Sequence, residues 1–147
     1  MRLVRNVVAG IFGAVLGTVP AYSIEYRSLA EPAILYDAPS KQGKPLFVVA
    51  RNTPVEVVVS VEGWIKVRDA DGAIAWIEKR ALADKRMLIA TTRAQARQQP
   101  DAGSALVFEA EKDVILELAE PGPAGWVKVR HRDGQTGFIR ANQIWGL

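Results

Sequence analysis

A fifteen-residue pattern occurs twice in this chain of 147 residues. Residues 63–77 read GWIKVRDADGAIAWI, and residues 125–139 read GWVKVRHRDGQTGFI, sixty-two positions later. Upstream the match continues with VEVVV at 55–59 and VILEL at 114–118, after a shift of three residues. The segment EPGPA at 120–124 contains the extra residues, and its Pro and Gly content is typical of a loop. Two copies are too few for a solenoid, so each is predicted to fold as a small closed domain.

Each copy has the pattern of short strands joined by tight turns. The upstream runs are rich in β-branched residues, and apolar residues alternate with polar ones inside the repeated pattern. The Asp-Gly pairs at 71–72 and 133–134 predict two-residue type I′ hairpin turns. KRAL at 79–82 and ANQI at 141–144 are long enough only for a single helical turn. No long stretch after the N-terminal segment has a 3.6-residue period, so the predicted class is all-β.

In their order along the chain, these features resemble the bacterial SH3-like (SH3b) domain, present twice. The family pattern has a small residue before proline, a hydrophobic strand, Gly-Trp-x-x-Val, an Asp-Gly turn, Gly-Trp-hydrophobic and a closing hydrophobic residue. The first copy supplies Ala38-Pro39, Val55–Val59, Gly63-Trp64 with Val67, Asp71-Gly72, Ala75-Trp76-Ile77 and Leu82. The second copy supplies Val114–Leu118, Gly125-Trp126 with Val129, Asp133-Gly134, Gly137-Phe138-Ile139 and Ile144. Ala75 departs from the glycine of the pattern, and residues 94–104 match its early part poorly.

The resemblance implies two small SH3-like β-barrels in tandem, each of about five strands, after an N-terminal signal peptide. We predict the signal peptide at 1–23, domain 1 at 24–86 and domain 2 at 87–147. Domains of this size bury modest cores. Packing of the two domains against each other is therefore expected to add stability, and the short join between them favours such packing.

The first 23 residues have the pattern of a secretory signal peptide. Residues 1–5 are basic, residues 7–19 are almost entirely apolar, and AYS at 21–23 provides small residues before a cut after Ser23. An uncleaved membrane anchor is the alternative, but the apolar run is shorter than the roughly 20 residues of a spanning helix. The absence of cysteine excludes a lipid-attached lipoprotein. A periplasmic or secreted protein that needs no disulfides is expected.

The balance of charge argues against a nucleic-acid partner. The formal net charge is +3, but Arg2 and Arg5 lie in the predicted signal peptide. Without them the chain has 17 basic and 16 acidic residues, a net charge of +1. Binding to a phosphate backbone requires a far stronger basic excess.

Alternation along the strands predicts an exposed face on each domain. Because alternate residues of a strand share a face, Ile65 and Val67 should point into the barrel and Trp64 outward. Ile77 should likewise point inward and Trp76 outward. In the family, the positions that match these two tryptophans lie on the ligand side. The candidate ligand-binding residues are therefore Trp64, Trp76, Lys66 and Arg68 in domain 1, and Trp126, Phe138, Lys128 and Arg130 in domain 2.

The same aromatic residues also have a structural interpretation. In so small a barrel they can cap the core, and the two faces can pack against each other. Tyr36 and Trp145 are predicted to be structural for the same reason. The stretch ILYDAP at 34–39 is similar to the Ala-Leu-Tyr-Asp-Tyr signature of eukaryotic SH3 domains. Polyproline binding is not predicted, because Ala38 and residues 78–81 replace the groove aromatics.

The sequence predicts no enzyme. The chain has no cysteine nucleophile, and its only histidine, His131, lies in a hairpin tip, where an exposed turn residue is expected. One histidine without cysteine does not build a usual zinc site, and no Gly-rich phosphate loop is present, so no metal or cofactor is predicted. Glu109, Glu111 and Asp113 alternate with other residues, and we interpret them as charges that protect an edge strand rather than as a glycosidase pair.

We therefore expect an exported, non-catalytic binding module of the bacterial cell envelope that contacts peptidoglycan or its stem peptides. Aromatic faces stack on sugar rings or peptide planes, and Lys and Arg pair with carboxylates. The alternative is a protein–protein adaptor that docks an envelope enzyme or assembly partner through the same face or an exposed strand edge. A third interpretation is that one domain alone binds, and domain 1, with tryptophan at both positions, is then favoured. No stable membrane span is expected after signal cleavage.

Overall fold

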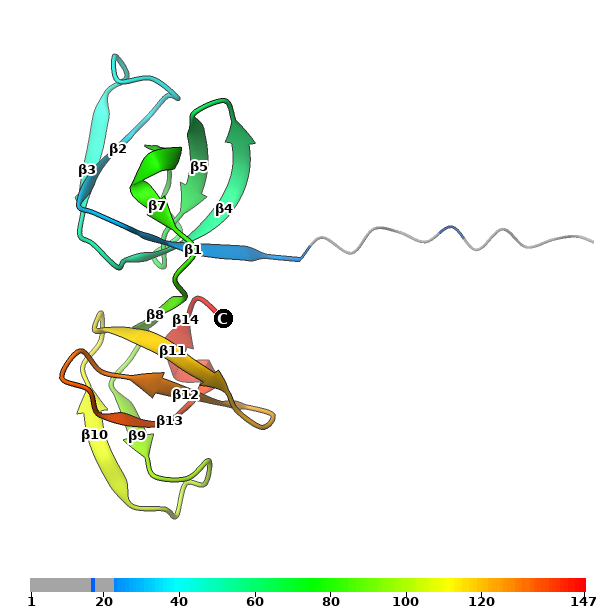
Figure 1. Ribbon diagram of the computed structural model, residues 1–147, viewed down its shortest axis with the longest axis vertical. Coiled ribbons are helices and arrows are strands. Elements are labelled where there is room, and N and C mark those ends of the chain that lie inside the picture. The colour runs from blue at the N-terminus through cyan, green and yellow to red at the C-terminus, as the bar shows by residue number, and fades with distance from the viewer. Residues whose placement is uncertain (1–16, 18–22) are drawn as a thin grey trace, which may run out of the picture.

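The computed structural model describes Gly17 and residues 23–147, and it contains two antiparallel sheets of seven strands each, one for each repeat (Figure 1). The predicted all-β class and the two tandem β-domains are thereby confirmed. The predicted signal peptide at 1–23 lies almost entirely outside the described residues.

Domain 1 is formed by the first sheet, whose strand order is β3-β2-β6-β5-β4-β1-β7. Its strands are β1 (Glu25–Leu29), β2 (Ala33–Tyr36), β3 (Pro45–Val49), β4 (Pro54–Val61), β5 (Trp64–Arg68), β6 (Ile74–Glu78) and β7 (Leu82–Ala83). The single helical turn expected after the repeated pattern is a 3₁₀ turn, η1 (Lys79–Ala81).

Domain 2 repeats this arrangement with the order β10-β9-β13-β12-β11-β8-β14. Its strands are β8 (Met87–Ala90), β9 (Ala94–Arg97), β10 (Leu106–Ala110), β11 (Ile115–Pro121), β12 (Trp126–Arg130), β13 (Thr136–Arg140) and β14 (Ile144–Trp145). The second 3₁₀ turn is η2 (Ala141–Gln143), again as expected.

The expected number of about five strands in each domain was too low. The first strand of each repeat, β1 or β8, pairs with the long strand that follows the hairpin, β4 or β11. It also pairs with the two-residue closing strand, β7 or β14. Because of these extra strand pairings, the backbone N–H and C=O groups near the domain junction are hydrogen-bonded within the sheet.

The core of each domain is built from the inward side of the repeated strands. Ile65, Val67 and Ile77 are at most 2% exposed, and Val129 and Ile139 of domain 2 are fully buried. The predicted alternation is therefore confirmed in both copies. Full burial of an aliphatic side chain is worth about 1.5–3 kcal/mol, so these positions hold the two sheets closed.

The Asp-Gly turns differ from the type I′ turns that the sequence predicted. Between β5 and β6 the loop has five residues, 69–73, and only Gly72 has a positive φ, of 88°. The Asp69 side chain accepts hydrogen bonds from the backbone N–H groups of Asp71 and Ala73 at 3.0 and 2.9 Å. This bonding closes a longer turn in which Asp71 keeps a negative φ, whereas type I′ requires a positive φ at both central residues.

The two domains meet at the short linker between β7 and β8, beside the C-terminus (Figure 1). The Tyr26 ring of β1 meets the Trp145 ring of β14 edge to face, with centroids 5.1 Å apart. The Arg86 guanidinium lies 5.7 Å from the Tyr26 centroid and donates a 2.7 Å hydrogen bond to the Gly146 carbonyl. Trp145 thus has a structural position, at the junction, as the sequence predicted.

Candidate binding faces

The outward side of β5 and β6 in domain 1 carries an aromatic cluster. Lys66 lies directly opposite Trp76, and its Nζ is 5.7 Å from the Trp76 ring centroid. Trp76 also pairs with Tyr36 of β2, whose ring meets Trp64 edge to face at 5.7 Å. All four side chains belong to half-buried residues, so part of each ring or chain remains accessible. We call this surface face 1 and define it as Tyr36, Trp64, Lys66, Trp76 and Glu78.

Glu78 is the acidic member of face 1. It lies opposite Trp64 on β6, accepts a 2.8 Å hydrogen bond from Arg80 Nε, and has Lys41 Nζ at 3.6 Å. The hydrogen bond from Arg80 lowers the pKa of the Glu78 carboxyl, partial burial opposes this effect, and the charges of Arg80 and Lys41 add to it. Glu78 was not among the predicted site residues, although the alternation that places Trp76 outward also places Glu78 outward.

Domain 2 presents an equivalent surface on β12 and β13. Trp126 lies opposite Arg140, whose guanidinium is 4.7 Å from the Trp126 ring centroid. Lys128 lies opposite Phe138, with its Nζ 5.9 Å from the ring centroid. Phe138 also pairs with Arg97 of β9, just as Trp76 pairs with Tyr36 in domain 1. Face 2 is defined as Arg97, Trp126, Lys128, Phe138 and Arg140.

Arg97 is held in place by two hydrogen bonds. Its Nη1 donates to the Ser104 carbonyl and its Nη2 to Gln95 Oε1, both at 2.8 Å. Sequence reasoning missed Arg97 because residues 94–104 match the family pattern poorly and gave no register for β9. Lys128 has an acidic neighbour, Glu120 of β11, at 3.8 Å.

The two remaining predicted residues lie farther along the same strands. Arg68 has a carboxylate oxygen of Glu56 at 4.0 Å, and Arg130 has one of Glu117 at 3.6 Å. Arg130 lines a cleft between the two domains. Both arginines are therefore engaged by carboxylates of the neighbouring strand, and the structure gathers the other six predicted residues into the two faces.

The faces do not pack against each other. The junction between the domains uses Tyr26, Arg86 and Trp145. The aromatic and cation–π contacts of faces 1 and 2 all lie within their own domains. The structural alternative in which the two faces bury each other is thus wrong, because a different set of aromatic residues forms the junction.

Domain 1 has an exposed apolar strand next to face 1. Val48 of the edge strand β3 is 81% exposed and lies opposite Ile34 of β2, which is 42% exposed. Leu46, two residues earlier on β3, is 39% exposed. A shallow pocket of about 270 Å³ joins Ile34 and Val48 to Tyr36 of face 1. We call Ile34, Leu46 and Val48 the apolar edge patch.

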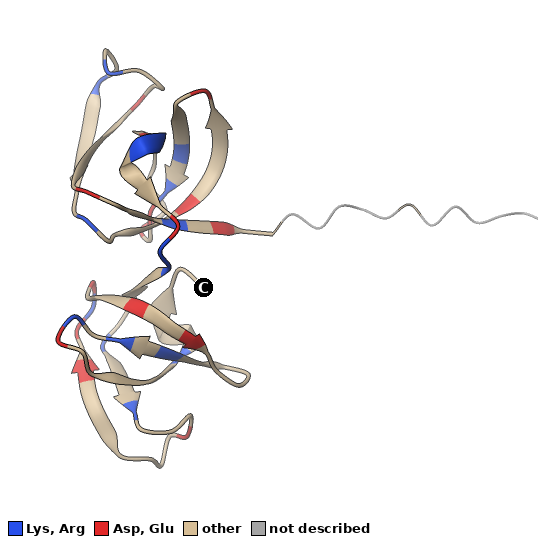
Figure 2. Cartoon of the chain, in the orientation of Figure 1, with Lys and Arg blue, Asp and Glu red and all other residues tan. Residues whose placement is uncertain are grey.

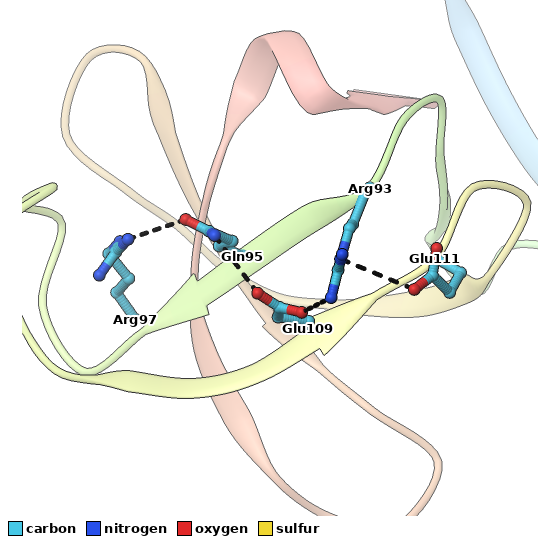
Figure 3. Close-up of polar contacts among 5 residues, drawn as sticks. All are labelled: Arg93, Gln95, Arg97, Glu109 and Glu111. Carbon is cyan, nitrogen blue, oxygen red and sulfur yellow. Dashed lines mark hydrogen bonds and ion pairs between the residues drawn. The ribbon is translucent and has the colours of Figure 1, made fainter.

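The matching edge of domain 2 carries a ladder of polar side chains (Figure 3). Arg93 pairs with both Glu109 and Glu111, and Gln95 Nε2 donates to Glu109 Oε1 at 3.3 Å. Arg97 then donates to Gln95, which extends the ladder toward face 2. The interpretation as a charge on an edge strand is confirmed for Glu109, because β10 is an outer strand of its sheet, whereas Glu111 and Asp113 lie beyond the end of β10 in the turn to β11.

His131 departs from the exposed turn position that was expected. It is half-buried, and its ring centroid lies 5.6 Å from that of Phe108. Its Nδ1 accepts a 3.3 Å hydrogen bond from the Asp133 N–H within the same turn. Within residues 17 and 23–147, no group of three or more His, Asp or Glu residues is placed to hold a metal ion. The described part of the chain also has no helix of the length and apolar character that a membrane crossing needs.

The fold and the two faces define a class of protein: a tandem arrangement of small β-domains, each with an aromatic and charged outward surface. Residues 30–84 and residues 90–146 both match the family described as the bacterial SH3 domain. The chain therefore belongs to the bacterial SH3 domain family and contains two copies of the domain. Domains of this family are non-catalytic binding modules, and they occur in extracellular and cell-envelope proteins.

Three solved structures are similar to the chain. NlpC2 from Trichomonas vaginalis is 14% identical over 85% of this chain and 49% of its own, and NlpC1 from the same organism is 15% identical over 92% and 50%. An NlpC/P60 family protein from Bacillus cereus ATCC 10987 is 14% identical over 82% of this chain and 56% of its own. The TM-score is 0.39 in each case, and this chain spans about half the length of these proteins. A search of curated proteins gave no match.

Proposed function

We propose that the protein is an exported, non-catalytic binding module of the cell envelope that contacts peptidoglycan or its stem peptides through faces 1 and 2. The observation that carries this proposal is the repeated pairing of a half-exposed aromatic ring with a cation across β5–β6 and β12–β13. Lys66 lies over Trp76, and Arg140 lies over Trp126. Such pairs offer a flat apolar surface with charge beside it.

This chemistry suits a glycan that carries peptides. An aromatic ring stacks on the apolar side of a sugar ring or on a peptide plane, and Lys or Arg pairs with a carboxylate. Each face offers only a few side chains to a ligand. A polymer with repeating units would engage both domains at once, which raises the overall affinity through effective concentration. The predicted signal peptide at 1–23 and the envelope location of the family support export.

Co-sedimentation with isolated peptidoglycan sacculi over a range of salt concentrations tests the proposal. We expect the purified protein to pellet with sacculi and the Trp64→Ala, Trp126→Ala double variant to stay in solution. Phe47→Ala serves as the matched control, because Phe47 is a 44% exposed aromatic residue outside both faces. Circular dichroism verifies that each variant is folded. Failure of the wild-type protein to pellet, or equal pelleting of the folded double variant, would contradict the proposal.

A second candidate function is a protein–protein adaptor, and the apolar edge patch is the observation that favours it. An outer strand with exposed Val48 and Leu46 offers both backbone pairing and apolar side chains to an extended partner segment. An adaptor of this kind would not pellet with sacculi, and after crosslinking one specific envelope protein would be recovered with it. Val48→Glu should abolish that recovery while the Trp64→Ala, Trp126→Ala double variant retains it.

A further inference from the structure

A cleft of about 470 Å³ opens between the two domains, apart from both faces. One wall is the β3–β4 turn of domain 1, with Arg51 and Asn52. The other wall belongs to domain 2 and includes Asp113 of the β10–β11 turn and the β12–β13 loop with Arg132. The linker residue Lys85 lies between them. A cleft of this volume lies within the usual range for sites that hold small ligands.

The cleft carries an excess of positive charge. Its lining contains four cationic side chains, Arg51, Lys85, Arg130 and Arg132, against the two carboxylates of Asp113 and Glu117. Charged segments lie on both sides of the linker (Figure 2). Glu117 is shared between Lys85 and Arg130, with an oxygen 3.6 Å from each.

Two of the four cations have no carboxylate partner. Within the described residues, neither Arg51 nor Arg132 has a carboxylate oxygen within 4.0 Å. One of them belongs to domain 1 and the other to domain 2. The walls of the cleft therefore each present an arginine whose hydrogen-bond donors are available to a ligand.

The backbone fixes the position of both walls. Asn52 and Asp113 occupy equivalent turns, with φ of 69° and 71°. The N–H of Asn52 donates to the Leu29 carbonyl and that of Asp113 to the Ala90 carbonyl, both at 2.8 Å. Asn and Asp tolerate this left-handed conformation better than other side chains. The turns are thus held by hydrogen bonds to their own sheets.

The linker at the base of the cleft is also fixed. The Ser28 Oγ hydroxyl of β1 donates a 2.7 Å hydrogen bond to the Lys85 carbonyl, and Ser28 is only 1% exposed. Together with the Tyr26–Trp145 contact at the junction, this bond holds the two walls in a defined relation. A ligand that enters the cleft then meets arginines whose backbone positions are already fixed, which lowers the entropic cost of binding.

We infer that the junction cleft binds an oxyanion, a carboxylate or phosphate group, between Arg51 of domain 1 and Arg132 of domain 2. A cleft with an excess of positive charge concentrates anions, and the arginine fork matches both oxyanions in a bidentate manner. The bound anion bridges the domains and stabilises their arrangement. This site is separate from faces 1 and 2, and its existence does not depend on the proposed function.

A titration followed by proton NMR tests this inference. His131 lines the cleft and is the only histidine in the chain, so its imidazole resonances report on the cleft alone. Inorganic phosphate and succinate are titrated separately at constant pH and constant ionic strength. We expect a saturable shift of the His131 signals. Saturation with only one of the two probes would identify the kind of oxyanion that the cleft takes.

Arginine variants separate the cleft from a general effect of charge. Arg51→Gln and Arg132→Gln should each weaken binding about tenfold, because each removes a charge-assisted hydrogen bond. Both residues are exposed, so the variants are expected to fold. Lys44→Gln removes the same charge at an exposed position outside the cleft lining and should leave binding unchanged. A shift that never saturates with either probe overturns the inference. The inference is also overturned if Arg51→Gln binds the anion as tightly as the wild type, because domain 2 alone would then bind it.

Discussion

Domain 1 and domain 2 share one strand register but present different surfaces. Ile34 lies opposite Val48 in domain 1, and at the corresponding place in domain 2 Gln95 lies opposite Glu109. The first pair is exposed and apolar, whereas the second belongs to the polar ladder of Figure 3. Because the inward residues of both domains are apolar, the outward residues differ between the two copies while the fold stays the same.

The two faces differ in charge at equivalent positions. Tyr36 of face 1 corresponds to Arg97 of face 2, and Glu78 corresponds to Arg140. Lys66 and Glu78 cancel each other in face 1, while face 2 contains the three cations Arg97, Lys128 and Arg140. One backbone frame therefore presents a nearly neutral aromatic surface in the first copy and a cationic surface in the second.

The largest expected effect concerns a buried position at which the domains differ, Ala75 in β6 and Gly137 in β13. A Cβ on Gly137 would lie 2.9 Å from the Cβ of Ala96 and 3.2 Å from the Arg97 carbonyl oxygen. We expect Gly137→Ala to lower the free energy of unfolding by about 1–3 kcal/mol through overpacking. Urea denaturation followed by tryptophan fluorescence measures this change.

Ala75→Gly tests the same position in domain 1. Ala75 is 3% exposed, so the variant removes a buried methyl group and adds backbone freedom, and we expect a loss of about 1 kcal/mol. Unchanged stability of both variants would show that the two cores tolerate exchange at this position.

The edge strands provide the second prediction. Glu109→Val breaks the contacts of Glu109 with Arg93 and Gln95 and gives β10 the apolar character of β3. We expect this variant to self-associate at lower protein concentration than the wild type, whereas Val48→Glu should self-associate less. Light scattering over a concentration series measures both. The comparison would be refuted if the two variants responded in the same direction.

The third prediction concerns the charge of the faces. If both faces contact peptidoglycan, Arg140→Glu in face 2 should weaken sacculus binding severalfold at low salt, because it reverses one of three cations. Glu78→Arg in face 1 should strengthen binding at low salt, and salt should remove most of either effect. Co-sedimentation at two salt concentrations measures these changes. If the two variants bound sacculi equally well at low salt, the contact with peptidoglycan would not involve positions 78 and 140.

The smallest expected effect is the pH dependence that Glu78 gives to face 1. The pKa of Glu78 in the folded protein lies below its ordinary value of 4.5, chiefly because Arg80 donates a hydrogen bond to it. Because the pKa of Glu78 is lowered in the folded protein, its carboxylate stabilises the fold at pH values above the pKa of the unfolded state. This stabilisation is lost as the pH falls through the pKa of the folded state. Carboxyl NMR measures the Glu78 titration, and Arg80→Gln should move its pKa back toward the ordinary value.

The repeat, the all-β class and the inward positions could all be predicted from the order of the amino acids. Ile65, Val67 and Ile77 were predictable because the two-residue period of a strand is a local property of the backbone. Trp64, Trp76, Lys66 and their counterparts in domain 2 followed from the same alternation. The two single helical turns were predictable as well, since their segments are too short for any longer helix.

The residues that complete each face, in contrast, depend on how the strands pair in three dimensions. Arg97 meets Phe138 across strands forty-one positions apart, and Arg86 of the linker meets Tyr26 of β1. Cross-strand partners are set by register, and the register of β9 could not be read from a segment without a recognisable pattern. The cleft between the domains likewise arises where the β3–β4 turn, the β10–β11 turn, the β12–β13 loop and the linker come together. Such a site depends on contacts between residues that are distant in sequence, and local periodicity carries no information about them.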